Sequence, residues 1–247
     1  MLFNAGGTHL HDGALSAWTP RHQAGHQAGL YLIIGLILMM GRRVVPVFIT
    51  SGVPEAFEPR NSRTLDVVSL LAYLVFFGAL LWPQDAGASV AALAAGLIFA
   101  ANLIRLAGWH TPGIWRRPLV WVLYLGMCFI TLGFLLHVLA HAGWIAPSLA
   151  VHAFAYGGIG LMTLGMMSRV SLGHSGRNIH QPAPAFAWAF ALLTVGALVR
   201  VFGPLLWPQH TPALFGLAQA LWMLSFGVFL LITLPMLTRA RVDGRPG

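Results

Sequence analysis

Charged residues are scarce in this chain of 247 residues, because Asp, Glu, Lys and Arg together make up only 8% of it. An average soluble domain carries about a quarter charged residues. Hydrophobic residues make up 57% of the chain, and the mean hydropathy is +0.76. This composition excludes an ordinary soluble domain, and it also excludes a disordered chain.

Lysine is absent altogether, so all 14 basic residues are arginine. Only 6 residues are acidic, which leaves a formal net charge of +8. Such a balance occurs in nucleic-acid-binding proteins, but these arginines are scattered between long apolar runs and form no continuous basic face. We therefore expect no nucleic acid among the partners of this chain.

Cysteine is almost absent as well, since Cys128 is the only one. A single cysteine excludes an intramolecular disulfide, an iron–sulfur cluster and a cysteine-rich zinc site. The sequence also lacks a Walker loop, a nucleotide fingerprint, paired intramembrane carboxylates and a nucleophile–base motif, which argues against hydrolytic and ATP-driven chemistry. Histidine is abundant by comparison, with 11 residues, so imidazole is the main candidate metal ligand.

Long apolar segments dominate what is present, and turn residues rich in Pro and Gly separate them. A helix needs about 20 such residues to cross a bilayer. The predicted fold class is therefore all-α, a polytopic membrane helical bundle with the lipid bilayer as its surroundings. We expect spans at 27–48, 64–82, 88–108, 118–141, 149–170, 184–206 and 212–237. This divides the chain into an N-terminal segment (1–26), the bundle (27–238) and a tail (239–247).

The arginines also predict the orientation of the bundle. Twelve of the 14 lie in the last turns of odd-numbered spans or follow them, and the cytoplasmic ends of membrane helices collect positive charge. The N-terminus is therefore expected on the periplasmic side and the C-terminus in the cytoplasm. Tryptophans are expected to form an aromatic belt at each interface, the outer one from Trp82, Trp144 and Trp207 and the inner one from Trp109, Trp115, Trp121 and Trp188.

An internal repeat is suggested by Trp82-Pro83-Gln84 and Trp207-Pro208-Gln209, which begin 125 positions apart. Two more pairs are 126 positions apart: His26 with His152, and Arg43 with Arg169. An offset of four helices preserves direction, so these matches predict a parallel repeat. Spans one and five would then each carry an imidazole near the outer face and a guanidinium near the inner one.

The outer histidines are the main candidates for cofactor chemistry. His22 with His26, and His137 with His141, are four residues apart, which places each pair on one helical face. Neutral imidazole binds both haem iron and copper. We therefore expect His26 and His152 to bind a haem or copper cofactor, with His22, His137 and His141 as further metal ligands. Backbone carbonyls or Tyr156 are expected to accept a hydrogen bond from the other ring nitrogen of His26 and His152. The alternative is that these are interfacial histidines bonded to water.

Arg200 is the second candidate, because it lies in the middle of the sixth span. A charge there costs a few kcal/mol or more unless it is paired or hydrated. It either lines a polar cavity or extends toward the outer interface, helped by Gly203 and Pro204 beyond it.

Two stretches at the inner ends of spans one and five, 41–50 (GRRVVPVFIT) and 168–177 (SRVSLGHSGR), closely resemble the NnrS family. The resemblance runs from about His26 to Thr238. It implies a bacterial inner-membrane protein that contains haem and copper, acts in nitric oxide metabolism or the nitrosative stress response, and meets nitric oxide or a nitrosyl-iron species. It also implies a fold of about twelve helices, of which this chain holds the last seven.

The same resemblance assigns a role to the second of these stretches. Gly173 is expected to end span five in a left-handed conformation, and His174, Ser175 and Arg177 to form a polar cytoplasmic corner. This corner serves either binding or the helix end itself.

Three functions remain open on these grounds. The first is a haem- or copper-binding membrane protein of the nitric oxide response. The second is a transporter or permease, which is suggested by the parallel repeat and by Pro46 and Pro235 breaking helix ends. The third is a membrane subunit without catalytic activity or metal.

Overall fold

The computed structural model describes residues 20–82 and 85–242, with the side chains of 20–27 and 85 left aside. Seven of its helical spans are long and apolar enough to cross a membrane, which confirms the predicted helical membrane bundle. The elements are α2 (Pro20–Gly52), α3 (Arg63–Leu80), α4 (Asp85–Trp109), η1 (Pro112–Arg116), α5 (Pro118–His141), α6 (Pro147–His152), η2 (Ala153–Ile159), α7 (Gly160–His174), α8 (Pro184–Leu206), η3 (Pro208–His210) and α9 (Thr211–Leu237).

The boundaries of α5 agree with the predicted span to the residue, and its caps explain why. Pro118 occupies the first helical position, where its missing N–H costs nothing. Gly143 follows the helix with φ of 78°, and the N–H of Trp144 donates back to the carbonyl of Leu139 at 3.1 Å. A left-handed glycine with this hydrogen bond is a strong helix stop.

The end of α7 uses the same device, but at a different glycine from the one expected. Gly176, with φ of 72°, takes the left-handed conformation, and the N–H of Arg177 donates to the carbonyl of Leu172 at 2.9 Å. Gly173 instead lies inside α7. The expectation for Gly173 was therefore wrong, because two further residues continue the helical hydrogen bonding before the chain turns.

Two prolines expected to break helix ends lie inside helices instead. α2 continues past Pro46 to Gly52, and α9 continues past Pro235 to Leu237. In a hydrocarbon environment, backbone groups outside a helix have no water to bond, so continuing the helix past a proline is favoured over ending it.

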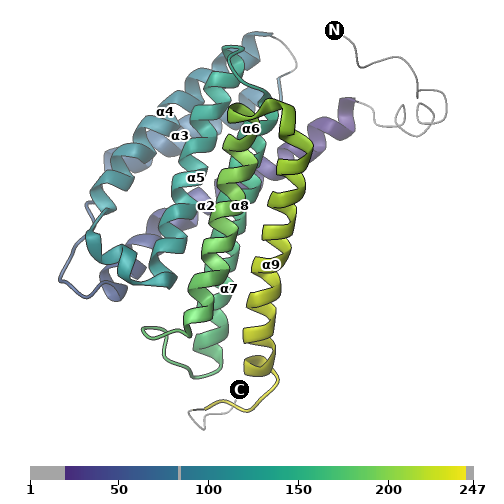
Figure 1. Cartoon of the computed structure of the whole chain (residues 1–247). Helices are drawn as coiled ribbons and strands as arrows, with labels where there is room; N and C mark the ends of the chain where they lie inside the picture. The colour runs from purple at the N-terminus through teal and green to yellow at the C-terminus, as the bar shows by residue number, and fades with distance from the viewer. Residues whose placement is uncertain (1–19, 83–84, 243–247) are drawn as a thin grey trace.

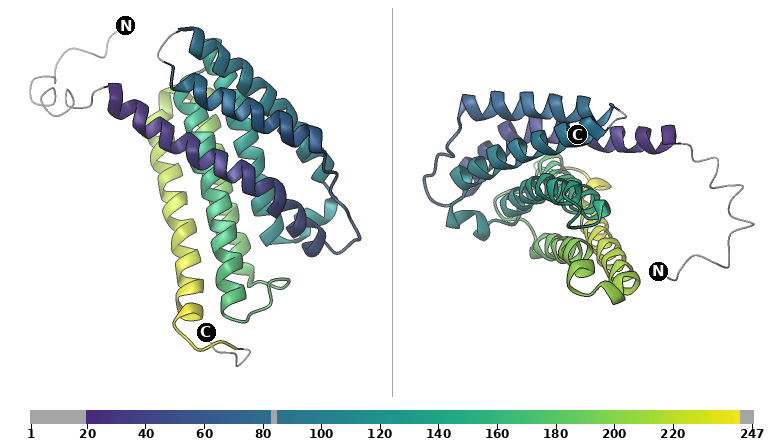
Figure 2. Two further views of the ribbon diagram at one scale, coloured as in Figure 1. Left: turned by 180° about the vertical axis from the view of Figure 1, so that it is seen from behind. Right: turned by 90° about the horizontal axis from the view of Figure 1, so that it is seen from above.

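α5 lies in the middle of the bundle (Figure 1) and contacts α2, α4, α6, α7 and α8. Figure 2 shows α2, α3 and α4 on one side of it and α8 and α9 on the other, the first group inclined to the second. Buried positions make up 72% of the apolar window of α5 but only 17% of that of α9. The core therefore surrounds α5, whereas α9 presents most of its surface outward.

Each half of the bundle contains a long antiparallel helix pair, α3 with α4 and α8 with α9. Trp82 follows the first helix of one pair, and Trp207 follows the first helix of the other. These positions agree with the proposed repeat, although the superposition of spans one to three on spans five to seven stays a prediction.

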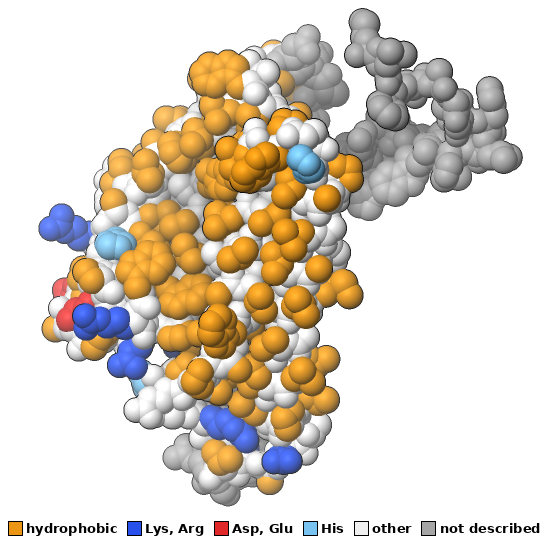
Figure 3. Space-filling model, viewed as in Figure 1, with side chains coloured by type: hydrophobic (Ala, Val, Ile, Leu, Met, Phe, Trp, Pro, Cys, Tyr) orange, Lys and Arg blue, Asp and Glu red, His pale blue; other side chains and the backbone are white. Residues whose placement is uncertain are grey.

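The surface of the bundle is largely apolar, as Figure 3 shows for one face. Trp82, Trp144 and Trp207 are exposed at one end of the helices, where an aromatic belt was expected. Trp109 was expected in the opposite belt, but it is fully buried, and its Nε1 donates to Asn61 Oδ1 at 3.0 Å. The expected place of Trp109 in the belt was wrong, because its indole lies in the core and binds the α2–α3 loop through Asn61.

We call the end of the bundle with the α2–α3, α4–α5 and α7–α8 loops the arginine end, and the other the histidine end. At the arginine end, Glu55 Oε1 accepts hydrogen bonds from Thr111 Oγ1 at 2.6 Å and from the N–H of Gly113 at 2.8 Å. The Thr111 bond is the main reason that the pKa of Glu55 is lowered. The carboxylate therefore joins the α2–α3 loop to the α4–α5 loop.

Replacing Glu55 by Gln should lower the melting temperature of the detergent-solubilised protein at neutral pH. Because folding lowers the pKa of Glu55, its contribution is full above its unfolded value, about 4.3, and is lost as the pH falls through the lower folded value. The difference between Glu55→Gln and wild type should thus shrink in acid. The exposed neighbour Glu58 supplies the control, Glu58→Gln, and a Glu55 effect that does not depend on pH would contradict this account.

The orientation predicted from the arginines is tested by reporter fusions. An alkaline phosphatase fused after Arg245 should be inactive, and a fluorescent protein at the same position should fluoresce, if the arginine end faces the cytoplasm. Active phosphatase at this position would show that the opposite orientation is correct.

Candidate functional site

A polar cluster lies at the histidine end between α6, α8 and α9. The guanidinium of Arg200 lies 3.7 Å from the ring centroid of Phe215, and the imidazole of His152 meets the same ring edge-on at 5.3 Å between centroids. Both polar side chains are half-buried. Arg200 therefore stacks on an aromatic ring of a neighbouring helix, and His152 shares that ring with it.

The backbone directly after His152 forms the π-helical stretch η2. A π-helical turn is rare and occurs frequently at functional sites, because it widens the helix and displaces side chains. Within it, Tyr156 donates its hydroxyl hydrogen to the carbonyl of Ala218 at 2.6 Å, which ties η2 to α9. The Tyr156 hydroxyl, which was expected as a hydrogen-bond acceptor for His152, thus donates its own hydrogen to the backbone of α9.

A second histidine group lies on α5. The ring of His137 packs edge-on against Phe76 of α3 at 5.1 Å and against Tyr31 of α2 at 6.4 Å. One turn later, His141 Nε2 lies 3.4 Å from Ser89 Oγ of α4. The described ring neighbours of His137 thus belong to α2 and α3, whereas that of His152 belongs to α9.

The remaining predicted ligands, His22 and His26, lie in the first turns of α2, and their side chains are outside the described residues. Among the side chains that are described, no group of three or more His, Cys, Asp or Glu could hold a metal ion. The structure therefore leaves the pairing of His26 with His152 as a prediction.

The candidates at the arginine end have different surroundings from one another. Arg169 places its guanidinium 3.8 Å from the ring centroid of Phe48, whereas its repeat partner Arg43 is exposed. His174 is exposed at the end of α7, and Arg177 is half-buried. The repeat thus relates the positions of Arg43 and Arg169 in the sequence but not their environments.

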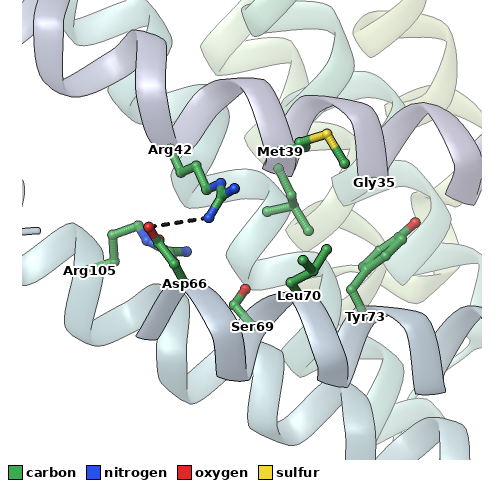
Figure 4. Close-up of a pocket in the computed structure, with 9 residues that line it drawn as sticks. Gly35, Met39, Arg42, Asp66, Ser69, Leu70, Tyr73 and Arg105 are labelled. Atoms are coloured by element: carbon green, nitrogen blue, oxygen red, sulfur yellow. Dashed lines mark hydrogen bonds and ion pairs between the residues drawn. The ribbon is translucent and has the colours of Figure 1, made fainter. Parts of the chain in front are cut away.

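A charged network that the sequence did not reveal joins α2, α3 and α4 (Figure 4). Asp66 accepts from Arg105 Nη2 at 2.9 Å and pairs with Arg42 Nη1 at 3.2 Å. Arg105 is only 5% exposed, and its Nη1 donates to Asn102 Oδ1 at 2.5 Å. One carboxylate thus neutralises only one of two guanidinium groups. Ser69 and Tyr73 border the same small cavity, which has a volume of about 30 Å³.

This network escaped sequence reasoning because its charges come from three separate spans. Arg42 and Arg105 were counted only as orientation signals, and a lone aspartate offered no carboxylate pair. The available signal was that Asp66 is an acidic residue inside a predicted span of a chain with 6 acidic residues. An intramembrane charge is a functional or structural candidate by default, and its partner should be sought.

A wide apolar groove between α4 and α5 is the other feature that the sequence did not reveal. Its volume is about 600 Å³, and it is open on one side. His110 lies at its edge and accepts a hydrogen bond on Nε2 from Trp115 Nε1 at 3.2 Å. The groove is lined by Phe99, Leu103, Leu106, Ala107, His110, Tyr124, Cys128, Thr131 and Leu132.

Replacing Asp66 by Asn should destabilise the bundle by about 3 kcal/mol, because it leaves the buried guanidinium of Arg105 without a counter-charge. Arg42→Gln is the matched control, since it removes the more exposed partner and should cost about 1 kcal/mol or less. Thermal unfolding in one detergent measures both variants. Equal losses would show that the network does not depend on the burial of Arg105.

Comparison with known families adds to this geometry. The family profile described as NnrS protein matches residues 1–241, which is nearly the whole chain. Searches of curated proteins and of solved structures find no match. The profile match agrees with the resemblance of the two stretches 41–50 and 168–177. The chain therefore belongs to the NnrS family.

Proposed function

We propose that this protein binds haem, copper or both near the histidine end and acts in nitric oxide metabolism or the nitrosative stress response in the bacterial inner membrane. The observation that carries the proposal is the meeting of His152, Arg200 and Phe215 beside the π-helical stretch η2. Membership of the NnrS family supports it.

The chemistry of this cluster fits a haem better than a lone metal ion. His152 supplies one neutral imidazole, which suffices as an axial ligand to haem iron, whereas a copper ion requires several donor atoms. Arg200 supplies a guanidinium that suits a haem propionate, because its fork matches a carboxylate. Phe215 holds the two side chains near each other, because Arg200 stacks on its ring and His152 meets the same ring edge-on. A bound haem would supply an iron atom able to take up nitric oxide or to exchange a nitrosyl-iron species.

The pair on α5 has the donor set expected for copper. His137 and His141 lie one turn apart on one helix face, and two imidazoles are a common part of a copper site. His137 is held by Phe76 and Tyr31, which limits the orientations of its ring. Further ligands would have to come from His22, His26 or residues outside this chain.

Protein purified from a haem-replete, copper-replete host should show a Soret band, and metal analysis should detect iron or copper. The double variant His26→Ala, His152→Ala should lose most of the haem. Arg200→Gln should weaken haem binding about tenfold. The absorption spectrum should keep its form, because Arg200 would bind a haem propionate and would not ligate the iron.

The matched control is His210→Ala, which removes an exposed histidine from the same end of the bundle. Its haem and metal content should equal that of wild type. If the double variant also equals wild type, the proposed ligands are wrong. If wild type has neither a Soret band nor bound metal, the transporter hypothesis gains support, and flux in liposomes would separate it from a subunit without activity.

A further inference from the structure

A small cleft opens at the arginine end, where α2, α5, α7 and the α7–α8 loop meet. Arg117 and Arg169 both line it, together with the first turn of α5 and with His180 of the loop. Its inner space is about 10 Å³, which is room for about one water-sized group. The cleft lies at the opposite end of the bundle from His152 and uses none of the residues of the proposed cofactor sites.

Both arginines that line the cleft lack a counter-charge among the described residues. The Nε atoms of Arg117 and Arg169 are buried and have no hydrogen-bond partner there. Arg117 uses its Nη1 to donate to the carbonyl of His180 at 2.9 Å, and Arg169 rests on the ring of Phe48. The ion pairs that the structure describes both use Asp66, and neither includes these arginines. Both side chains are half-buried as a whole, but an enclosed N–H donor without an acceptor is unfavourable, which points to a ligand.

The start of α5 adds a second source of positive potential to the same cleft. In the first turn of this 24-residue helix, Pro118 has no N–H, and the N–H groups of Val120 and Trp121 donate to the carbonyl of Arg117 at 2.9 and 3.0 Å. This leaves the N–H of Leu119, a residue that lines the cleft, without a carbonyl partner in that turn. Arg117 is the N-cap residue and gives no side-chain hydrogen bond to that turn. The partial positive charge of a helix N-terminus favours an anion.

From these features we propose that Arg117, Arg169 and the N-terminus of α5 form a binding site for a phosphate-type oxyanion. One oxygen of the anion enters the cleft, and the remainder stays at its mouth. The guanidinium fork suits phosphate because it donates two parallel hydrogen bonds. Two sources share this chemistry, the headgroup of an anionic lipid and a soluble phosphate.

The surroundings place lipid within reach of the cleft. Val170, directly after Arg169, is 50% exposed, and Trp188, in the first turns of α8, is 70% exposed. Basic pockets between membrane helices commonly hold anionic lipid headgroups. The site thus lies at the border between an apolar surface and a polar loop, where a lipid phosphate would be found.

The test compares wild type, Arg169→Gln, Arg169→Lys and the double variant Arg117→Gln, Arg169→Gln in nanodiscs. One set of nanodiscs contains phosphatidylcholine alone, and the other contains equal parts of phosphatidylcholine and phosphatidylglycerol. Native mass spectrometry measures retained phosphatidylglycerol, and thermal shift measures the response to inorganic phosphate. The matched control is Arg63→Gln, because Arg63 is exposed at the same end and does not line the cleft.

Wild type should retain phosphatidylglycerol or be stabilised by phosphate, and Arg169→Gln should weaken that binding about tenfold. Arg169→Lys should recover part of it, because the charge remains but the fork is lost. Retention of phosphatidylglycerol without a phosphate response identifies a lipid site, and a phosphate response in phosphatidylcholine alone identifies a soluble oxyanion. If wild type responds to neither probe, or if the Arg63 control loses as much binding as Arg169→Gln, the proposal is overturned.

Discussion

Close packing around α5 is the interaction on which the rest of this bundle depends. Lipid is as apolar as a leucine side chain, so helices in a membrane associate through tight contact rather than through the hydrophobic effect. A Cβ at Gly133 would lie 2.6 Å from the ring of Phe154, and one at Gly157 would lie 2.4 Å from Phe129. These two glycines let α5 and η2 approach each other across large aromatic rings, and the other helices pack on that centre.

Polar contacts then tie the outer helices to this centre at both ends. At the arginine end, Asp66 joins three helices through Arg42 and Arg105. At the histidine end, Tyr156 ties η2 to α9. Phe215 of α9 contacts both His152 and Arg200. The proposed cofactor cluster and the proposed oxyanion site thus lie at opposite ends of the bundle, and both include basic side chains that the fold leaves without a carboxylate partner among the described residues.

Much of the fold could be predicted because hydrocarbon length and helix stops act locally. The boundaries of α5 and α8 follow from apolar runs that begin at a proline. The site was less predictable, because its contacts join residues far apart in the chain. Arg200 was recognised as anomalous from its position alone, but its partner Phe215 carries no signal of its own in an apolar segment. For the same reason, the charged network of Asp66 was overlooked and the burial of Trp109 was not predicted.

The sequence by itself determined that this chain forms helices long enough to span a membrane, that its basic residues gather at the ends of alternate spans, and that it resembles the NnrS family. Those properties depend on composition, segment length and short motifs, each of which is contained in a continuous stretch of the chain. Only the tertiary structure decided which side chains meet: Arg200 and His152 on one ring, Asp66 between two arginines, and Arg117 beside Arg169. The rotation of each helix about its axis sets these meetings, and that rotation depends on packing against neighbours, which no single segment specifies.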